Sequence, residues 1–216
     1  MSDTERVYIP AAGRDWLLPF YDPLQWLLGG HRVRAAMLDA AELRPGMRAL
    51  DVGCGTGSLV VELVRRHPGV EVTGLDPDPL ALRRARRKLE RAGLEARLDE
   101  GFADALPYAD GSFDRVFSSF MFHHLSRPTK EGMLREVQRV LVPGGALHLA
   151  DFGGEAHGHE HGLLARFVHS AEELAENFGG AIPRLAQAAG FGPVRELSSR
   201  RTLFGRVAHY EARRPS

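Results

Sequence analysis

The sequence is poor in cysteine, in long apolar runs and in net charge. It holds one cysteine, Cys54, among 216 residues, which excludes an internal disulfide framework and a cysteine-based zinc knuckle. No apolar run approaches the ~20 residues that a membrane span needs. Its 28 Lys and Arg residues equal its 28 Asp and Glu residues in number. The chain therefore lacks the net positive charge that would attract nucleic acid. We expect a soluble, cytoplasmic protein with no membrane span and no nucleic-acid partner.

Short apolar strands alternate with amphipathic helices from residue 47 onward. The pattern predicts strands at 47–52, 70–75, 96–100, 113–117 and 146–152. It predicts helices at 32–41, 57–67 and 130–141, and a basic helix that Asp76-Pro77-Asp78-Pro79 opens and that runs to about residue 92. Further helices are expected at 163–177 and 181–189, followed by antiparallel strands near 193–198 and 202–212. Such alternation is typical of a doubly wound α/β sheet. The expected fold is a Rossmann-like, seven-stranded sheet with six parallel strands, an antiparallel last strand and helices on both faces.

The strongest motif is a glycine-rich loop after the first strand, Leu-Asp-Val-Gly-Cys-Gly-Thr-Gly at 50–57. Glycines at the end of a strand let the backbone turn tightly and let a ligand approach the main chain. Its third glycine comes one residue earlier than in the dinucleotide pattern Gly-x-Gly-x-x-Gly. Asp51 would also repel phosphates and suits an ammonium group. The motif indicates a cofactor site, and a tight turn without a ligand is the alternative.

A second carboxylate, Asp76, ends the next predicted strand, 25 residues after Asp51. Consecutive strands of an open sheet end side by side at the crevice where ligands bind. A carboxylate at this point can accept hydrogen bonds from both hydroxyls of a ribose. The alternative is a plain N-cap for the helix that follows.

These residues resemble class I S-adenosylmethionine-dependent methyltransferases, in particular the ubiquinone/menaquinone-biosynthesis type (methyltransferase type 11). The matches run in order over about half the chain: Leu-Asp-Val-Gly-Cys-Gly-Thr-Gly (50–57), Gly-Leu-Asp (74–76), Ala-Leu-Pro-Tyr (105–108), Gly-Ser-Phe-Asp (111–114), Ser-Ser-Phe (118–120), His-His-Leu (123–125) and Leu-Val-Pro-Gly-Gly (141–145). The resemblance implies S-adenosyl-L-methionine as cofactor and S-adenosyl-L-homocysteine as product. The methyl group would pass to a C, O or N atom of a small or lipid-like acceptor.

The resemblance also implies an organisation and a set of cofactor-binding residues. We expect one methyltransferase domain over 1–216, with cap helices in 1–41, the cofactor-binding core in 42–152, and a lid loop, helices and closing strands in 153–216. Asp51 would lie near the amino group of the methionine part, Asp76 would bind the ribose and Pro77 would pack on the adenine. The other expected contacts are Gly53, Cys54, Gly55, Thr56, Phe102, Ala103, Asp104 and Ser119.

One position departs from the family. Phe102 stands where relatives often have Asp or Asn to accept from the adenine amino group, and a phenyl ring cannot do so. Asp104 would take over that contact if the loop turns it inward. Otherwise Asp104 is a solvated turn residue, and Phe102 stacks on the base.

The sequence shows no Ser/His/Asp or Cys/His nucleophile arrangement, as expected where the transferred methyl group is already activated on a sulfonium. A general base is needed only when the acceptor starts out protonated. The candidates for such a base are His123, His124 and Tyr21, with Asp151 and His148 behind them. A structural role for these histidines is the alternative.

A histidine cluster, His157, His159 and His161, has side chains that could bind Zn²⁺. It lies in a glycine-rich stretch, so we expect a lid and no metal site. Two other functions stay open: a catalytically silent cofactor-binding protein of the same fold, and an NAD-dependent oxidoreductase. The sequence is also compatible with a homodimer.

Overall fold

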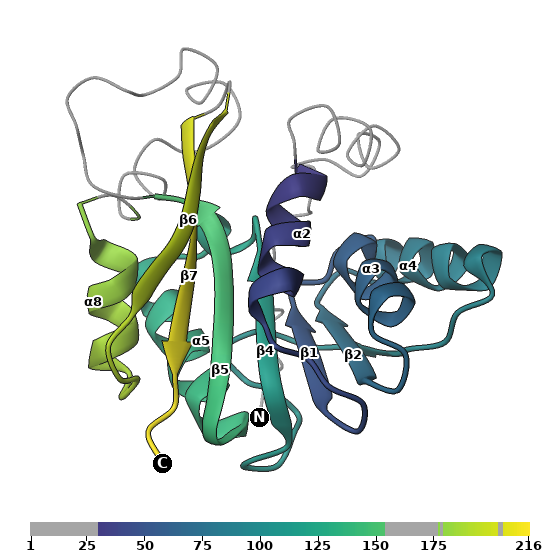
Figure 1. Ribbon diagram of the computed structural model, residues 1–216, viewed down its shortest axis with the longest axis horizontal. Helices are drawn as coiled ribbons and strands as arrows, with labels where there is room; N and C mark the ends of the chain where they lie inside the picture. The colour runs from purple at the N-terminus through teal and green to yellow at the C-terminus, as the bar shows by residue number, and fades with distance from the viewer. Residues whose placement is uncertain (1–29, 154–176, 178, 203–204) are drawn as a thin grey trace, which may run out of the picture.

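The predicted strands build one seven-stranded sheet in the order β3-β2-β1-β4-β5-β7-β6 (Figure 1). This computed structural model describes residues 30–153, 177, 179–202 and 205–216. The strands are β1 (Arg48–Val52), β2 (Glu71–Asp76), β3 (Arg97–Glu100), β4 (Phe113–Ser119), β5 (Leu141–Phe152), β6 (Arg195–Thr202) and β7 (Gly205–Arg213). Neighbours pair in parallel from β3 to β5, and β7 runs antiparallel between β5 and β6. The predicted fold is confirmed.

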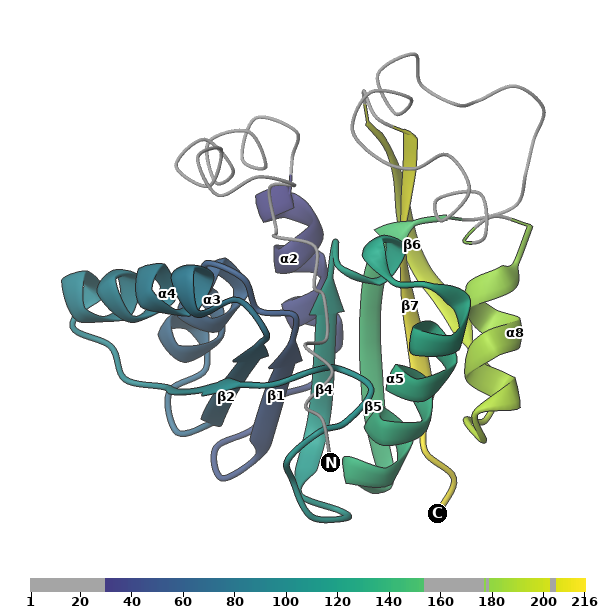
Figure 2. The ribbon, with the colours of Figure 1, turned by 180° about the vertical axis from the view of Figure 1, so that it is seen from behind.

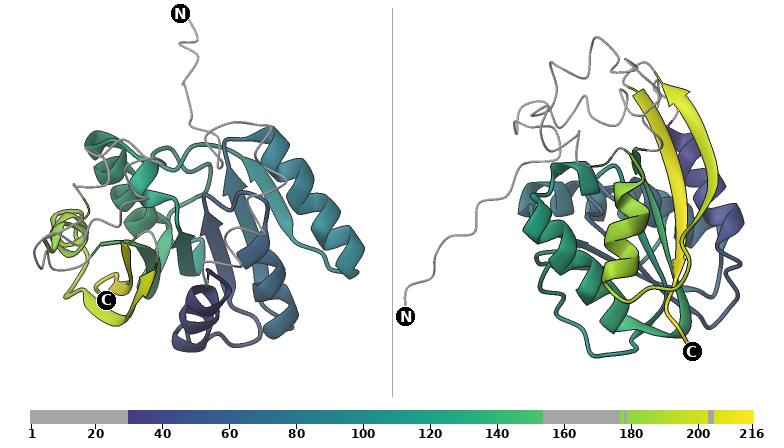
Figure 3. Two further views of the ribbon diagram at one scale, coloured as in Figure 1. Left: turned by 90° about the horizontal axis from the view of Figure 1, so that it is seen from above. Right: turned by 90° about the vertical axis from the view of Figure 1, so that its left-hand side faces the viewer.

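Helices cover both faces of the sheet (Figures 2 and 3). They are α2 (Gly30–Ala40), α3 (Ser58–Arg66), α4 (Pro79–Ala92), α5 (Arg127–Val140) and α8 (Ala181–Ala188), with a 3₁₀ turn η2 (Phe122–His124). Side chains of α2, α3 and α4 share one buried cluster with Phe117. Side chains of α5 and α8 share the other with Val116. Because neighbouring strand residues point to opposite faces, β4 supplies both halves of the core.

The strand β5, which pairs with β4 and β7, is longer than the sequence predicts. It begins at Leu141 instead of residue 146 and includes Pro143-Gly144-Gly145, a segment whose residue types favour a turn. Gly144 has a φ of +75°, and the register with β4 shifts between Phe113 and Arg115. A glycine-bearing irregularity of this kind lets a strand continue through a local bend.

Several expected features lie outside the described residues. They are the cap segment before residue 30 with Tyr21, the lid with His157, His159 and His161, and nearly all of the helix expected at 163–177. Among the helices that the structure does describe, none is both long enough and apolar enough to cross a bilayer.

Candidate active site

The carboxyl ends of four neighbouring strands bring polar side chains to one edge of the sheet. Asp51 of β1 lies in register with Gly74 of β2 and with Phe117 of β4. Ser119, the half-buried last residue of β4, lies opposite Ala150 of β5. The crevice outside these strand ends is where ligands bind in open α/β sheets.

The glycine-rich loop uses its own amides to hold itself to β2. Gly53 and Cys54 both donate their backbone N–H to the carbonyl of Leu75, at 2.8 and 3.0 Å. The N–H of Gly55 donates to Oδ2 of Asp76 at 2.8 Å. A pyrophosphate group is bound by loop amides that point at the ligand. Here these amides are committed within the protein, so the loop does not suit a dinucleotide.

Close packing explains why the loop needs glycine. Gly53 has a φ of +72°, and a Cβ built on it would lie 2.4 Å from Cγ of Met121. A Cβ on Gly57 would lie 2.7 Å from Cβ of Ala85 in α4. Any side chain at either position would collide with a neighbour, so the loop is fixed between α4 and the segment that leads into η2.

Asp51 is a buried carboxylate whose hydrogen-bonding capacity is not fully used by the described residues. Its exposed fraction is 1%, and Oδ1 has no hydrogen-bond partner within the described chain. Burial and the nearby charge of Asp76 raise the pKa of Asp51 to about 7, although Arg34 lowers it. A buried acceptor without a donor is costly in a folded protein. The crevice therefore offers a cationic or hydrogen-bond-donating ligand group a ready acceptor.

Asp76 holds the loop and still has acceptor capacity. Its Oδ1 accepts from the N–H of Asp78 at 2.9 Å, and its Oδ2 accepts from that of Gly55. Burial raises the pKa of Asp76 to about 6. Each carboxylate oxygen can accept a second hydrogen bond, so ribose hydroxyls fit in addition. The alternative of a helix cap is wrong for Asp76, because Asp78 caps α4 by accepting from the N–H of Leu80 at 2.7 Å.

Two loop residues predicted to contact the cofactor, Cys54 and Thr56, have side chains with partners inside the protein. The thiol of Cys54 belongs to the buried cluster on the α3 side, where burial raises its pKa. The hydroxyl of Thr56 accepts a hydrogen bond from Nζ of Lys88 at 2.9 Å. These two residues would therefore contact a cofactor through their backbone atoms.

The segment after β3 starts next to Asp76. The N–H of Gly101 donates to the carbonyl of Asp76 at 3.2 Å, and this bond brings Phe102 and Ala103, both half-buried, to the end of β2. Asp104 packs against Gly132 of α5, because a Cβ built on Gly132 would lie only 2.9 Å from the Cβ of Asp104. The half-buried Asp104 is not a fully solvated turn residue.

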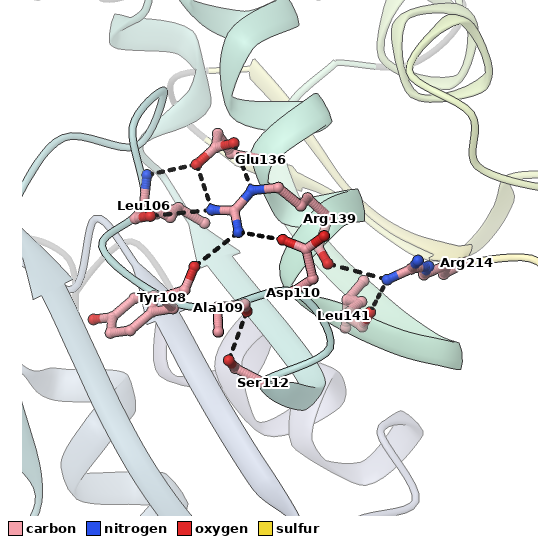
Figure 4. A network of polar contacts seen from close by, with 9 residues as sticks. All are labelled: Leu106, Tyr108, Ala109, Asp110, Ser112, Glu136, Arg139, Leu141 and Arg214. Carbon is pink, nitrogen blue, oxygen red and sulfur yellow. Dashed lines mark hydrogen bonds and ion pairs between the residues drawn. The ribbon is translucent and has the colours of Figure 1, made fainter.

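A clamp built on Arg139 of α5 holds the rest of this segment (Figure 4). Its guanidinium donates to the carbonyls of Leu106 and Tyr108, at 3.1 and 2.8 Å, and pairs with Asp110 at 2.8 Å. Glu136 completes the clamp, since it pairs with Arg139 and accepts from the N–H of Leu106. This clamp is not among the features predicted from the sequence, although Glu136 and Arg139 stand three residues apart on one helix.

The histidine candidates separate into two places. His123 in η2 lies with its Nδ1 2.6 Å from Oδ1 of Asp151, and the ring of His124 lies next to it. His148, in contrast, is fully buried within β5 and contacts His209 of β7 at 3.2 Å. His148 is therefore a core residue. The contact between His123 and Asp151 is not predicted from the sequence, although the carboxyl ends of the adjacent strands β4 and β5 meet at one edge of the sheet.

Comparison with known proteins agrees with this geometry. Residues 49–145 match the family of methyltransferase domains. The demethylmenaquinone methyltransferase of Thermus thermophilus is 42% identical over 139 residues, which are 63% of this chain and 62% of that enzyme. A ubiquinone/menaquinone biosynthesis C-methyltransferase of Cereibacter sphaeroides is 37% identical over 137 residues, 61% of this chain and 54% of that one. The chain thus spans less than two thirds of these relatives.

A solved structure shares the fold. The crystal structure of a putative methyltransferase from Bacillus halodurans superposes with a TM-score of 0.69 at 18% identity, over 85% of this chain and 99% of that one. The matched methyltransferase domain covers a little under half of the chain, and the relatives named above are methyltransferases of quinone biosynthesis, which the sequence of this chain resembles.

Proposed function

We propose that the protein transfers a methyl group from S-adenosyl-L-methionine to a small, lipid-like acceptor. The observation that carries this proposal is Oδ1 of Asp51, a buried acceptor with no donor in the described chain. It lies beside a loop whose amides at Gly53, Cys54 and Gly55 are donated within the protein. This donor and acceptor set fits the ammonium group at the amino acid end of the cofactor and does not fit a pyrophosphate, which argues against an NAD-dependent oxidoreductase.

The crevice residues would each contact a different part of the cofactor. Asp51 would accept from the cofactor's ammonium group, and Asp76 would accept from its ribose hydroxyls. Pro77, Phe102 and Ala103 would line the adenine, while Asp104 and Ser119 complete the wall. The bound cofactor supplies a methyl group that is already activated on a sulfonium. What remains for the protein is to hold the acceptor in line and to exclude water.

The relatives suggest the acceptor class. Demethylmenaquinone is named as the substrate of one relative, and the other is a C-methyltransferase of quinone biosynthesis. We therefore propose a hydroxylated aromatic ring of the quinol type as acceptor. The parts of the chain outside residues 49–145 would select it, since the matched domain carries the cofactor crevice.

A screen with radiolabelled methyl donor tests the proposal. The full chain is incubated with reduced naphthoquinones, phenols, sterols and amines, and the label in each acceptor is counted. We expect label in the reduced naphthoquinones or phenols. A protein that binds S-adenosyl-L-homocysteine but labels no acceptor would instead be the catalytically silent cofactor-binding protein.

A further inference from the structure

A buried histidine–aspartate pair lies beside the cofactor loop. His123 and Asp151 have exposed side-chain fractions of 3% and 1%, and Nδ1 and Oδ1 lie 2.6 Å apart. Met121, two residues before His123, packs directly on Gly53 of the loop. The pair therefore stands at the crevice, next to the bend that would hold the methionine part of the cofactor.

The aspartate fixes how the histidine carries its proton. Asp151 also accepts from the N–H groups of His123 and Phe152, at 3.1 and 2.6 Å. Burial raises the pKa of Asp151, but the charge of His123 and these hydrogen bonds outweigh it and leave the pKa below its usual value. A charged carboxylate can only accept. Whenever the imidazole is neutral, its one proton therefore lies on Nδ1, and Nε2 carries the lone pair.

Neighbouring rings fix the plane of the imidazole. The ring of His124 lies 4.0 Å from that of His123, centroid to centroid. Phe152 meets the His123 ring edge-on at 5.1 Å. A histidine with its Nδ1 bound to a buried carboxylate and its ring held in one orientation has the arrangement of a general base that is oriented by a third group.

From this geometry we propose that His123 is the general base of the methyl transfer, that Asp151 is its positioning residue, and that the acceptor is a hydroxyaryl compound whose O–H proton must leave. The inference rests on the proposed function and deepens it. An acceptor that already presents a lone pair and has no proton to lose would need no base. The presence of an oriented general base therefore indicates an acceptor whose reacting group starts out protonated.

The proposed reaction transfers one proton and one methyl group. The acceptor's O–H proton passes to Nε2 of His123, and the imidazolium is stabilised by Asp151. The electron pair left on the oxygen, shared with the ring, forms a bond from the oxygen or the ortho carbon to the methyl carbon. The methyl–sulfur bond breaks, and its electron pair stays on sulfur. Where the oxygen is methylated, the imidazolium then releases its proton to water. Where the ortho carbon is methylated, its hydrogen passes as a proton to water, and the oxygen takes its own proton back from His123.

Two variants distinguish a general-base role of His123 from a purely structural role. His123→Asn keeps a donor near the position of Nδ1, so the hydrogen bond to Asp151 survives, but it removes Nε2. Asp151→Asn keeps the size of the side chain and removes the charge that sets the tautomer. The matched control is His67→Asn, which removes an imidazole at the C-cap of α3, far from β5 in the chain and outside the crevice.

The first measurement needs no substrate. Imidazole ¹⁵N NMR of the full chain, with His123→Asn used to assign the signal, reports which ring nitrogen is protonated. We expect the proton of neutral His123 on Nδ1 in the wild type and a loss of this preference in Asp151→Asn. A neutral His123 with its proton on Nε2 would overturn the proposal, because that nitrogen could not then accept one.

The second measurement varies the acidity of the acceptor. Methyl transfer is compared for 1-naphthol, which is protonated at neutral pH, and for a dinitro-1-naphthol, which is already ionised. His123→Asn should lower transfer to 1-naphthol by about 10²–10⁴-fold and leave transfer to the ionised probe within a few-fold of wild type. The control His67→Asn should change neither.

The outcomes distinguish this proposal from the proposed function. An equal loss for both probes in His123→Asn, with unchanged affinity for S-adenosyl-L-homocysteine, would make His123 an anchor and overturn the base. A wild-type protein that binds the homocysteine product but methylates neither naphthol would overturn the hydroxyaryl class. A wild-type protein that does not bind the product would overturn the proposed function itself.

Discussion

Asp51 shows at the scale of one residue how a binding site is retained at a cost in stability. Its carboxylate is buried, one oxygen has no partner in the described residues, and its pKa is raised to about 7. The folded protein therefore holds a proton that the unfolded chain releases from about pH 4 upward. This group's contribution to stability falls as the pH rises from about 4 to 7, and it stays low above that range.

Asp51→Asn should thus stabilise the protein without cofactor and weaken cofactor binding. We expect the variant's gain in free energy of unfolding to grow between pH 4 and 7 to an order of 1–4 kcal/mol. Affinity for S-adenosyl-L-homocysteine should fall by roughly 1.5–3 kcal/mol, the scale of a hydrogen bond to a charged group. Urea unfolding across this pH range and calorimetry measure the two effects. An unchanged affinity would remove Asp51 from the binding site.

At the scale of elements, the clamp between α5 and the segment after β3 links packing to cofactor binding. Arg139→Ala removes the donors to Leu106, Tyr108 and Asp110 and should lower the free energy of unfolding by about 1–3 kcal/mol. Because Phe102 and Ala103 belong to the same segment, affinity for S-adenosyl-L-homocysteine should fall as well. The conservative control is Arg139→Lys, which keeps the charge but loses the bidentate contact. Full affinity in Arg139→Ala would show that the adenine side does not depend on the clamp.

The strands β5 and β7 share a buried pair of neutral histidines. Burial lowers the pKa of His148 to about 3 and that of His209 to about 4, from an ordinary 6.5. Between these values the unfolded chain binds more protons than the folded protein, so stability is lost as the pH falls below 6.5. Each histidine contributes at most about 1.4 kcal/mol per pH unit to this slope.

Urea unfolding at a series of pH values tests the histidine pair. His209→Gln removes one of the two titrations and keeps a polar side chain at the strand pairing. The slope of unfolding free energy against pH, between the folded value of about 4 and the ordinary 6.5, should become flatter in the variant. Parallel curves for wild type and variant would contradict the assignment.

At the scale of the whole molecule, local patterns predict the framework well. The parallel pairing of the first five strands follows from their alternation with helices, and the antiparallel last strand follows from the short link before it. The positions of Asp51 and Asp76 follow from strand ends that meet at one sheet edge. These features depend on short-range sequence signals, and for that reason they can be predicted from the sequence.

Contacts between distant segments could not be predicted in this way. The pair His123–Asp151 spans 28 residues and needs the exact course of η2 beyond β4. The clamp from Arg139 to Leu106 needs the path of a segment without regular structure. The extension of β5 through Gly144 depends on pairing with β4 and β7, which overrides the turn preference of Pro-Gly-Gly. In each case tertiary packing decides between locally plausible conformations.

The most direct test of the central claim compares two ligands of the same crevice by calorimetry. If Asp51 and the glycine loop bind the ammonium group of an amino acid end, S-adenosyl-L-homocysteine binds the full chain in the micromolar range and NAD does not bind. Asp51→Asn should then weaken the first ligand and leave the second without binding. NAD binding more tightly than S-adenosyl-L-homocysteine would contradict the account.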